Sequence, residues 1–337
     1  MFNKRIALVC NSTNPDLALY FRKKVKFFKG SVSFFAQKKL ADELGVGVSS
    51  FSDKSGFSKR FFLDAFYSIF VFFKILFGKN QVVIFDTAHI SNLPLSVMLK
   101  LTPIKQVFTI HDWSAHEGEQ ARVVNLYNKF VKNVLADEFI VFSKVDSDKP
   151  IHQLKLSGFN FIGGREHKNY FLFFGRIEPY KGLRHIIKIA EHLAEVSPDT
   201  KIVIAGKGDD KSLPCISKLS NVELINRFIP DDELNELIQH SIGTLLPYDS
   251  ATQSGVIIHS YSLGKPVIAF EVGELPAYVE QNYSGKVVQH GDIKGFVSAM
   301  LELCAQSQVL EKNVESYFKS FDESALASQY ESVFKRV

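Results

Sequence analysis

Short runs of consecutive apolar residues recur along the whole chain. Continuous rather than alternating apolar character is typical of strands that are buried on both faces, as in parallel sheets covered by helices. The order of strands and helices therefore predicts an α/β protein with doubly wound sheets. The predicted strands are residues 6–10, 81–85, 105–110, 138–142, 170–174, 201–206, 222–225, 243–247 and 265–270.

Segments with helical spacing separate many of these strands. Asp322 precedes the last predicted helix and has a typical N-cap side chain. The predicted helices are residues 181–195, 231–240, 254–263 and 323–337.

The longest apolar stretch runs from Phe61 to Phe77 and is interrupted by Asp64 and Lys74. It falls short of the ~20 residues that a transmembrane helix needs. Its aromatic stripe and basic flanks resemble those of a helix at a membrane interface, and packing under a sheet is the alternative. The stripe comprises Phe62, Phe66, Ile69, Phe70, Phe73 and Phe77, and the basic residues are Lys59, Arg60, Lys74 and Lys79.

Charge divides the chain into two halves. Residues 1–167 carry 23 Lys and Arg against 14 Asp and Glu, a net +9, whereas residues 168–337 carry 17 against 22, a net −5. Gly163, Gly164 and the polar run 165–169 form a linker at this change. We therefore expect two domains, residues 1–167 and 168–337, with ligands in the cleft between them. The basic half would face an anionic partner such as a membrane surface.

Several classes of function lack their sequence signals. Cys10, Cys215 and Cys304 match no disulfide framework or zinc spacing, so we expect a reducing compartment. The first apolar run is too short for a signal peptide. No GxGxxG follows the first strand, which disfavours a dinucleotide oxidoreductase. No nucleic-acid-binding module accompanies the basic charge, so we expect no nucleic-acid partner.

Two short patterns could hold a metal ion. Asp146 and Asp148 match the DxD signature of metal-dependent transferases, but a three-residue match is weak. His111, Asp112 and His116 could supply nitrogen and oxygen ligands, although an ordinary polar loop explains them equally well. We predict no metal site and no cofactor.

Two segments of the second half could bind an anion. Arg176 and Lys181 stand five residues apart in a turn from a strand to a helix, where a guanidinium fork and a lysine charge can hold a diphosphate. The small residues 249–255 precede another helix, whose first N–H groups can face an anion, and Gly255 lets a ligand approach the backbone. Surface basic residues and an ordinary N-cap are the alternatives.

The motifs FxGRxxxxKG, IVIAGKG, NVELINRFIPDDEL, LLPYxxxxQSGV and GKPVIAFEVGELP follow one another within residues 170–290. Their order resembles the carboxy-terminal domain of the family 4 glycosyltransferases. In the first domain the resemblance narrows to FTIHD (108–112) and ADEFIVFS (136–143). It implies the GT-B fold, with two Rossmann-like doubly wound domains facing an interdomain cleft. Residues 1–167 would bind the acceptor and residues 168–337 the nucleotide sugar.

The resemblance also implies roles for individual residues. Arg227 and Phe228 would lie beside the nucleotide base, and His259 beside the ribose. His111 would reach the donor sugar from the first domain. The donor diphosphate and sugar would be held by Arg176, Lys181, Thr252, Gln253, Ser254, Gly255 and Val256.

By the same resemblance, the chain would be a retaining, metal-independent glycosyltransferase of surface polysaccharide or glycan biosynthesis. It would move a sugar from a nucleoside diphosphate to a saccharide, expected to be lipid-linked, in the cytoplasm with peripheral contact to an anionic membrane.

One departure from the family pattern leaves an alternative function open. The family usually has Glu-x7-Glu where this chain has Ala251 and His259. The chain could instead be a non-catalytic GT-B protein that binds a nucleotide sugar or a partner transferase.

Overall fold

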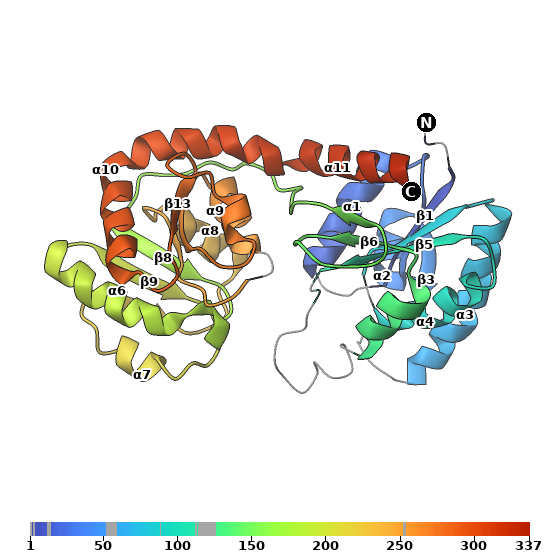
Figure 1. The fold of residues 1–337 in the computed structure, drawn as a ribbon, viewed down its shortest axis with the longest axis horizontal. Coiled ribbons are helices and arrows are strands. Elements are labelled where there is room, and N and C mark those ends of the chain that lie inside the picture. The colour runs from blue at the N-terminus through green and yellow to red at the C-terminus, as the bar shows by residue number, and fades with distance from the viewer. Residues whose placement is uncertain are drawn as a thin grey trace. The chain divides into compact units, whose positions relative to one another are not determined.

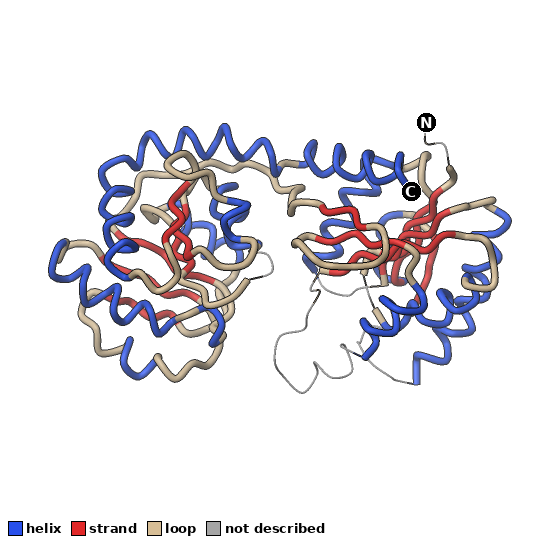
Figure 2. Tube along the Cα trace, viewed as in Figure 1, coloured by secondary structure: helices blue, strands red, loops and turns tan. Residues whose placement is uncertain are grey.

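The chain folds into two compact units, each built around one parallel sheet (Figures 1 and 2). The computed structural model describes residues 2, 4–11, 15–51, 59–87, 89–111, 113, 126–251 and 254–337. The first unit comprises Met1–Gly158 and Leu326–Val337, and the second Phe159–Ala325. By contacts, the boundary therefore follows Gly158 rather than residue 167, and a C-terminal segment joins the first unit.

The sheet of the first unit has seven strands in the order β3-β2-β1-β4-β5-β6-β7, all paired in parallel. Helices α3 and α4 share one face of this sheet, where Val71 and Leu95 pack against Val83 and Phe85. The strands are β1 Ile6–Cys10, β2 Ser33–Gln37, β3 Gly47–Ser50, β4 Val82–Phe85, β5 Lys105–Ile110, β6 Glu138–Val141 and β7 Ile151–Gln153, and the helices are α1 Pro15–Phe28, α2 Lys38–Leu44, α3 Lys59–Phe77, α4 Leu93–Leu99 and α11 Glu323–Arg336.

The sheet of the second unit has six parallel strands in the order β10-β9-β8-β11-β12-β13. In both units the first strand lies between the second and the fourth of its sheet, which is the doubly wound Rossmann order. The predicted α/β class and doubly wound sheets are confirmed. The strands are β8 Tyr170–Phe174, β9 Lys201–Ala205, β10 Val222–Ile225, β11 Thr244–Leu246, β12 Val267–Phe270 and β13 Gly285–Val288, and the helices are α6 Leu183–Val196, α7 Leu213–Ile216, α8 Asp231–Gln239, α9 Gly255–Ser262 and α10 Ile293–Phe318.

Helix α11 packs against the first unit, beside α1 (Figure 1). The rings of Phe334 and Phe28 meet edge to face with centroids 4.9 Å apart, and the Lys24 amine lies 4.1 Å from the centre of the Tyr330 ring. Asp322 caps the helix by accepting the N–H of Ala325 at 2.9 Å, as predicted. The buried aromatic face of α11 explains why this segment leaves the second unit.

Helix α3 buries one face and exposes the other. Val71 and Ile75 pack into the core of the first unit, whereas Phe66 and Phe77 are 60% and 81% exposed. Packing under the sheet therefore applies to only one face of the helix, and the described residues of the predicted stripe lie on the other; the Phe62 side chain is outside the described part of the structure. Within the described part of the chain, no helix is long and apolar enough to cross a membrane. The exposed residues of the stripe are Phe66, Ile69, Phe70, Phe73 and Phe77, and Leu63 adjoins them.

Candidate nucleotide-sugar site

The carboxyl ends of β8 and β11 are neighbours at the point where the strand order of the second sheet reverses. Gly175 follows β8 with φ +107°, a conformation that favours glycine. A Cβ atom there would lie 2.7 Å from the Lys181 amine. Gly206, after β9, allows an equally close approach, because its Cβ would lie 1.8 Å from the Gly175 carbonyl oxygen. The missing side chain of Gly175 thus leaves room for the Lys181 amine at the end of the strand.

Lys181 is buried and carries an ammonium group in an unfavourable environment. Burial and the neighbouring charge of Arg176 lower the pKa of Lys181 to about 8, and Glu178 offsets only part of this. Its amine lies 5.5 Å from the centre of the buried Tyr248 ring. Arg176 itself is exposed. Two cations side by side, one desolvated, would gain from a multiply charged anion.

The N-terminus of α9 completes this part of the site. Ser254 is the N-cap residue, yet its side chain makes no capping hydrogen bond. Among the described residues, nothing lies within 4 Å of a Cβ placed on Gly255, so their packing does not require glycine at this position. A Val256 methyl group would lie 3.8 Å from a Cβ on Gly175, which brings this helix end to Lys181. Thr252 and Gln253, two of the predicted binding residues, lie outside the described residues.

The residues expected beside the nucleotide base and ribose lie after β10 and within α9 of the second unit. Arg227 follows β10 and forms a two-pronged ion pair with Glu233, with N–O distances of 2.9 and 2.5 Å. The adjacent Phe228 side chain is 73% exposed. His259 of α9 shares a hydrogen bond of 2.8 Å between its Nε2 and Asn235 Oδ1, and its ring packs edge-on against Phe174. The ribose and base roles remain predictions.

His111 belongs to the first unit and lies directly after β5. Its half-buried ring stacks on Phe142, with centroids 4.9 Å apart. Asp146 and Asp148 are exposed and form no metal-binding group within the described chain. Asp112 and His116, the other candidate metal ligands, lie outside the described residues.

Sequence reasoning missed a second set of polar residues in the first unit. Lys24 and Asp86 form a buried ion pair at the end of β4. Asn11, which follows β1, donates to Asn92 at 2.7 Å. Asn11 and Asp86 follow β1 and β4, the two strands at the strand-order reversal of the first sheet, where doubly wound proteins bind ligands. A signal was present, because each residue directly follows a predicted strand.

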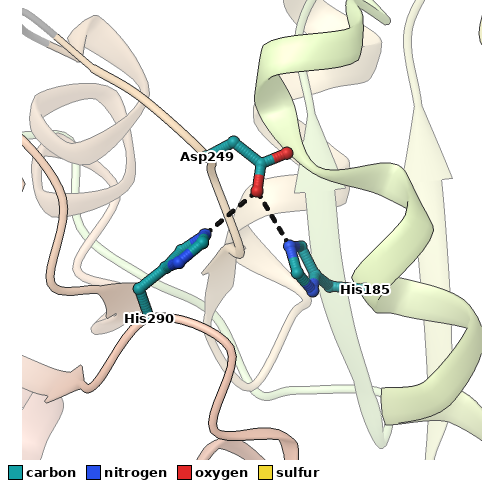
Figure 3. Close-up of side chains that lie close together, drawn as sticks. All are labelled: His185, Asp249 and His290. Atoms are coloured by element: carbon teal, nitrogen blue, oxygen red, sulfur yellow. Dashed lines mark hydrogen bonds and ion pairs between the residues drawn. The ribbon is translucent and has the colours of Figure 1, made fainter.

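It also missed a cluster of three side chains in the second unit (Figure 3). Asp249 Oδ1 accepts hydrogen bonds from His185 Nε2 at 2.9 Å and from His290 Nε2 at 3.0 Å. Burial opposes ionisation of Asp249, but these bonds and the charge of Arg184 hold the pKa of its carboxyl below the usual range. No local spacing joins these residues, so only the fold reveals the cluster.

The sequence of the second unit resembles known proteins. Residues 168–306 match the family model of the group 1 glycosyl transferases. An uncharacterized glycosyltransferase of Haemophilus influenzae is 22% identical over 62% of this chain and 61% of its own length. A putative glycosyltransferase of Bacillus subtilis, YtcC, is 24% identical over 60% of each chain. The chain thus matches about three fifths of the length of these relatives.

Solved structures resemble the whole chain in fold. Anabaena HepE in complex with UDP has a TM-score of 0.70 at 14% identity, covering 99% of this chain and all of that one. The lipopolysaccharide outer core galactosyltransferase WaaB in its apo form has a TM-score of 0.69 at 16% identity, with the same coverage. The fold is therefore GT-B, as predicted. The sequence match to the group 1 glycosyl transferases covers residues 168–306, which lie within the second unit.

Proposed function

We propose that this chain is a glycosyltransferase that moves a sugar from a nucleoside diphosphate to a saccharide acceptor. One observation carries the proposal: a buried lysine, an exposed arginine and an open helix N-terminus meet at the strand-order reversal of the domain that matches the family. This is the place where doubly wound sheets bind nucleotides. The leaving diphosphate gains negative charge, which these groups can stabilise.

The donor would lie across the carboxyl ends of the second sheet. Its diphosphate would contact Arg176, Lys181 and the N–H groups of Gly255 and Val256, with Thr252, Gln253 and Ser254 beside them. Phe228 offers an exposed aromatic face for the base, and His259 a ring nitrogen for the ribose. HepE was solved with UDP and with UDP-glucose, which makes UDP the first nucleotide to test.

The acceptor would bind to the first unit, with His111 acting on the donor sugar. We propose transfer with retention and without a divalent metal at the diphosphate, because the protein itself supplies the cations. The acceptor would be a lipid-linked saccharide. The exposed aromatic face of α3, followed by the exposed Lys79, suits peripheral contact with an anionic membrane on its cytoplasmic side.

A non-catalytic nucleotide-sugar binder is the second candidate. Ala251 has no carboxylate to hold the donor sugar, and His259 is already hydrogen-bonded to Asn235. Such a protein would bind the donor and leave the sugar unreacted. Release of free UDP from UDP-sugars in the presence of extracted membrane lipids distinguishes a transferase from a binder.

Thermal unfolding in the presence of UDP, GDP, ADP, CDP and dTDP tests the donor site. A diphosphate at 100 times its Kd should raise the free energy of unfolding by about 2.7 kcal/mol. One base should stand out, and its monophosphate should stabilise less. If none of the five shifts the melting temperature at millimolar concentration, the chain has no nucleoside diphosphate site and both candidate functions fail.

A further inference from the structure

His185, Asp249 and His290 reach one point from three separate segments of the second unit (Figure 3). His185 lies in the first turn of α6, Asp249 follows β11, and His290 follows β13. Their ligand atoms all lie within 4.8 Å of one another. Among the described residues, this is the only group of three side chains that could hold a metal ion. We propose that it binds a divalent transition metal, with Zn²⁺ as its best occupant.

The donor set supports this choice. Two imidazole nitrogens and one carboxylate oxygen suit Zn²⁺ and related first-row ions better than Mg²⁺ or Ca²⁺, which prefer oxygen ligands. Both imidazoles direct Nε2 at the same oxygen. Bonds of about 2.0–2.1 Å in a tetrahedral site place ligand atoms roughly 3.3 Å apart. The separations of 2.9 and 3.0 Å between Asp249 Oδ1 and the two imidazole nitrogens are close to that value, and all three ligand atoms lie within 4.8 Å of one another.

Without a metal, the side-chain hydrogen bonds to the Asp249 carboxylate all go to one of its two oxygens. Oδ1 accepts from His185, His290 and Arg184, the last at 2.8 Å, whereas the buried Oδ2 has no hydrogen-bond partner among the described residues. A metal ion would replace the two imidazole N–H donors, and either carboxylate oxygen could serve it. Arg184 can withdraw at little cost, because its side chain is 62% exposed.

The surroundings hold the three ligands in place. The Phe270 ring packs edge-on against both imidazoles, with centroid distances of 5.2 Å to His185 and 5.4 Å to His290. The Asp249 N–H donates to the Tyr180 carbonyl at 2.8 Å. His290 is 42% exposed, which leaves a route for the ion and a position for a water ligand. The ligands are thus held in position, and an ion can reach them from solvent.

The bound ion would anchor the loop between β11 and α9 at its start. Asp249 lies two residues before Ala251, whose carbonyl oxygen approaches Gly273 so closely that a Cβ there would lie 1.7 Å from it. The ion would tie this loop to α6 and to the segment after β13. This role is structural: the three ligands are not among the residues assigned to the diphosphate, but Asp249 begins the loop that leads to α9.

Metal binding by the full chain without a histidine tag tests the proposal. After removal of metals with a chelator, Zn²⁺ is titrated in competition with a chromophoric chelator, and Co²⁺ binding is followed by its visible absorption. We expect one ion per chain. His290→Ala and Asp249→Asn should each weaken Zn²⁺ binding at least tenfold. His192→Ala, on the exposed side of the same helix α6, is the matched control and should leave binding unchanged.

The same variants separate a metal site from a hydrogen-bonded cluster without metal. If His290→Ala and Asp249→Asn lower the melting temperature while the wild type binds Zn²⁺ no more tightly than they do, the proposal is wrong. It is also wrong if His192→Ala loses as much affinity as His290→Ala. Should Asp249→Asn fail to fold, His290→Gln on the exposed segment gives the same comparison, with circular dichroism as the check on folding.

Discussion

Lys181 shows how a proposed binding residue can destabilise the fold that carries it. Its ammonium group is buried beside Arg176 and has lost much of its hydration. A buried charged group is stabilised when a ligand of opposite charge compensates for the hydration that the group has lost. Lysine and arginine in a surface turn are ordinary from the sequence alone, but the burial of one of them is not.

Replacing either cation should weaken binding of the diphosphate. Losing a charge-assisted hydrogen bond costs roughly 1.5–3 kcal/mol, so Arg176→Ala and Lys181→Ala should each raise the Kd about 10- to 150-fold. Isothermal titration with the nucleoside diphosphate that stabilises the wild type measures this. Lys188→Ala, an exposed residue of α6, is the control and should bind as the wild type does. Unchanged affinity in both variants, at unchanged melting temperature, would contradict the assigned site.

The pKa of Lys181 predicts how diphosphate affinity depends on pH. Below pH 8 the amine is charged and can pair with the diphosphate, and above about 8 the free protein loses that charge. Affinity should therefore fall as the pH rises through 8, and binding at pH 8 should take up a proton. Titrations in two buffers of different ionisation enthalpy measure this uptake. Lys181→Gln should abolish it, and uptake that persists in this variant would assign the proton to another group.

The same pKa shift has the opposite effect on stability. In the unfolded chain Lys181 keeps its ordinary pKa of 10.5, so between pH 8 and 10.5 the unfolded state binds more protons than the folded state. The contribution of Lys181 to the free energy of unfolding therefore rises with pH across this window. Below pH 8 both states are protonated, and the cost of burying the charge is present in full.

At the scale of single elements, one face of α3 is buried in the core and the other is exposed. Asp64, which interrupts the apolar sequence, is buried and accepts the Phe51 N–H at 2.6 Å. The aromatic stripe instead faces solvent, with Phe66 and Phe70 in edge-to-face contact with each other. Exposed apolar patches of this kind mark interaction sites on otherwise well-packed proteins.

Charge substitutions on this stripe should release the protein from membranes without unfolding it. The pair Phe66→Asp and Phe70→Asp removes apolar contact with the bilayer, whereas Val71→Asp on the buried face of the same helix should unfold the first unit. Co-sedimentation with vesicles containing anionic lipid at low salt measures binding. A folded wild-type protein that stays in the supernatant would end the membrane hypothesis.

The basic residues of α3 and its flank should act through charge alone. Each Lys or Arg near an anionic surface contributes about 1 kcal/mol, so Lys74→Gln and Lys79→Gln should each weaken vesicle binding roughly fivefold. Lys59→Gln and Arg60→Gln, at the start of α3, extend the series. Nucleotide affinity, measured in parallel, should stay unchanged in every variant.

The sequence predicts most elements of this fold because buried parallel strands read as continuous apolar runs. All nine predicted strands appear, for example β1 at Ile6–Cys10 and β8 at Tyr170–Phe174. The missed strands β2, β3, β7 and β13 are short, lie away from the centres of their sheets, or contain glycine and polar residues. The proximity of Arg176 and Lys181 was predictable, because both residues lie in one turn from a strand to a helix. The cluster around Asp249 was not, because sheet pairing alone brings its members together.

At the scale of the whole molecule, the proposed transfer reaction uses residues from both units. His111 lies in the first unit and the donor diphosphate groups in the second. His111→Ala should therefore reduce sugar transfer at least tenfold while leaving UDP affinity near the wild-type value, because a residue acting on the sugar contributes mainly in the transition state. His152→Ala, an imidazole on β7 of the same unit, is the control. Equal transfer rates in wild type and His111→Ala would remove the role assigned to this residue.

The return of α11 to the first unit sets an order for synthesis on the ribosome. Residues 326–337 leave the ribosome only after the whole second unit has been made. The second unit, which is continuous in sequence, can therefore fold while the first still lacks Tyr330 and Phe334. During that interval Phe28 and the Lys24–Asp86 pair lack the aromatic cover that α11 provides. The nascent first unit therefore stays incompletely covered until residues 326–337, which follow the second unit in the sequence, have been made.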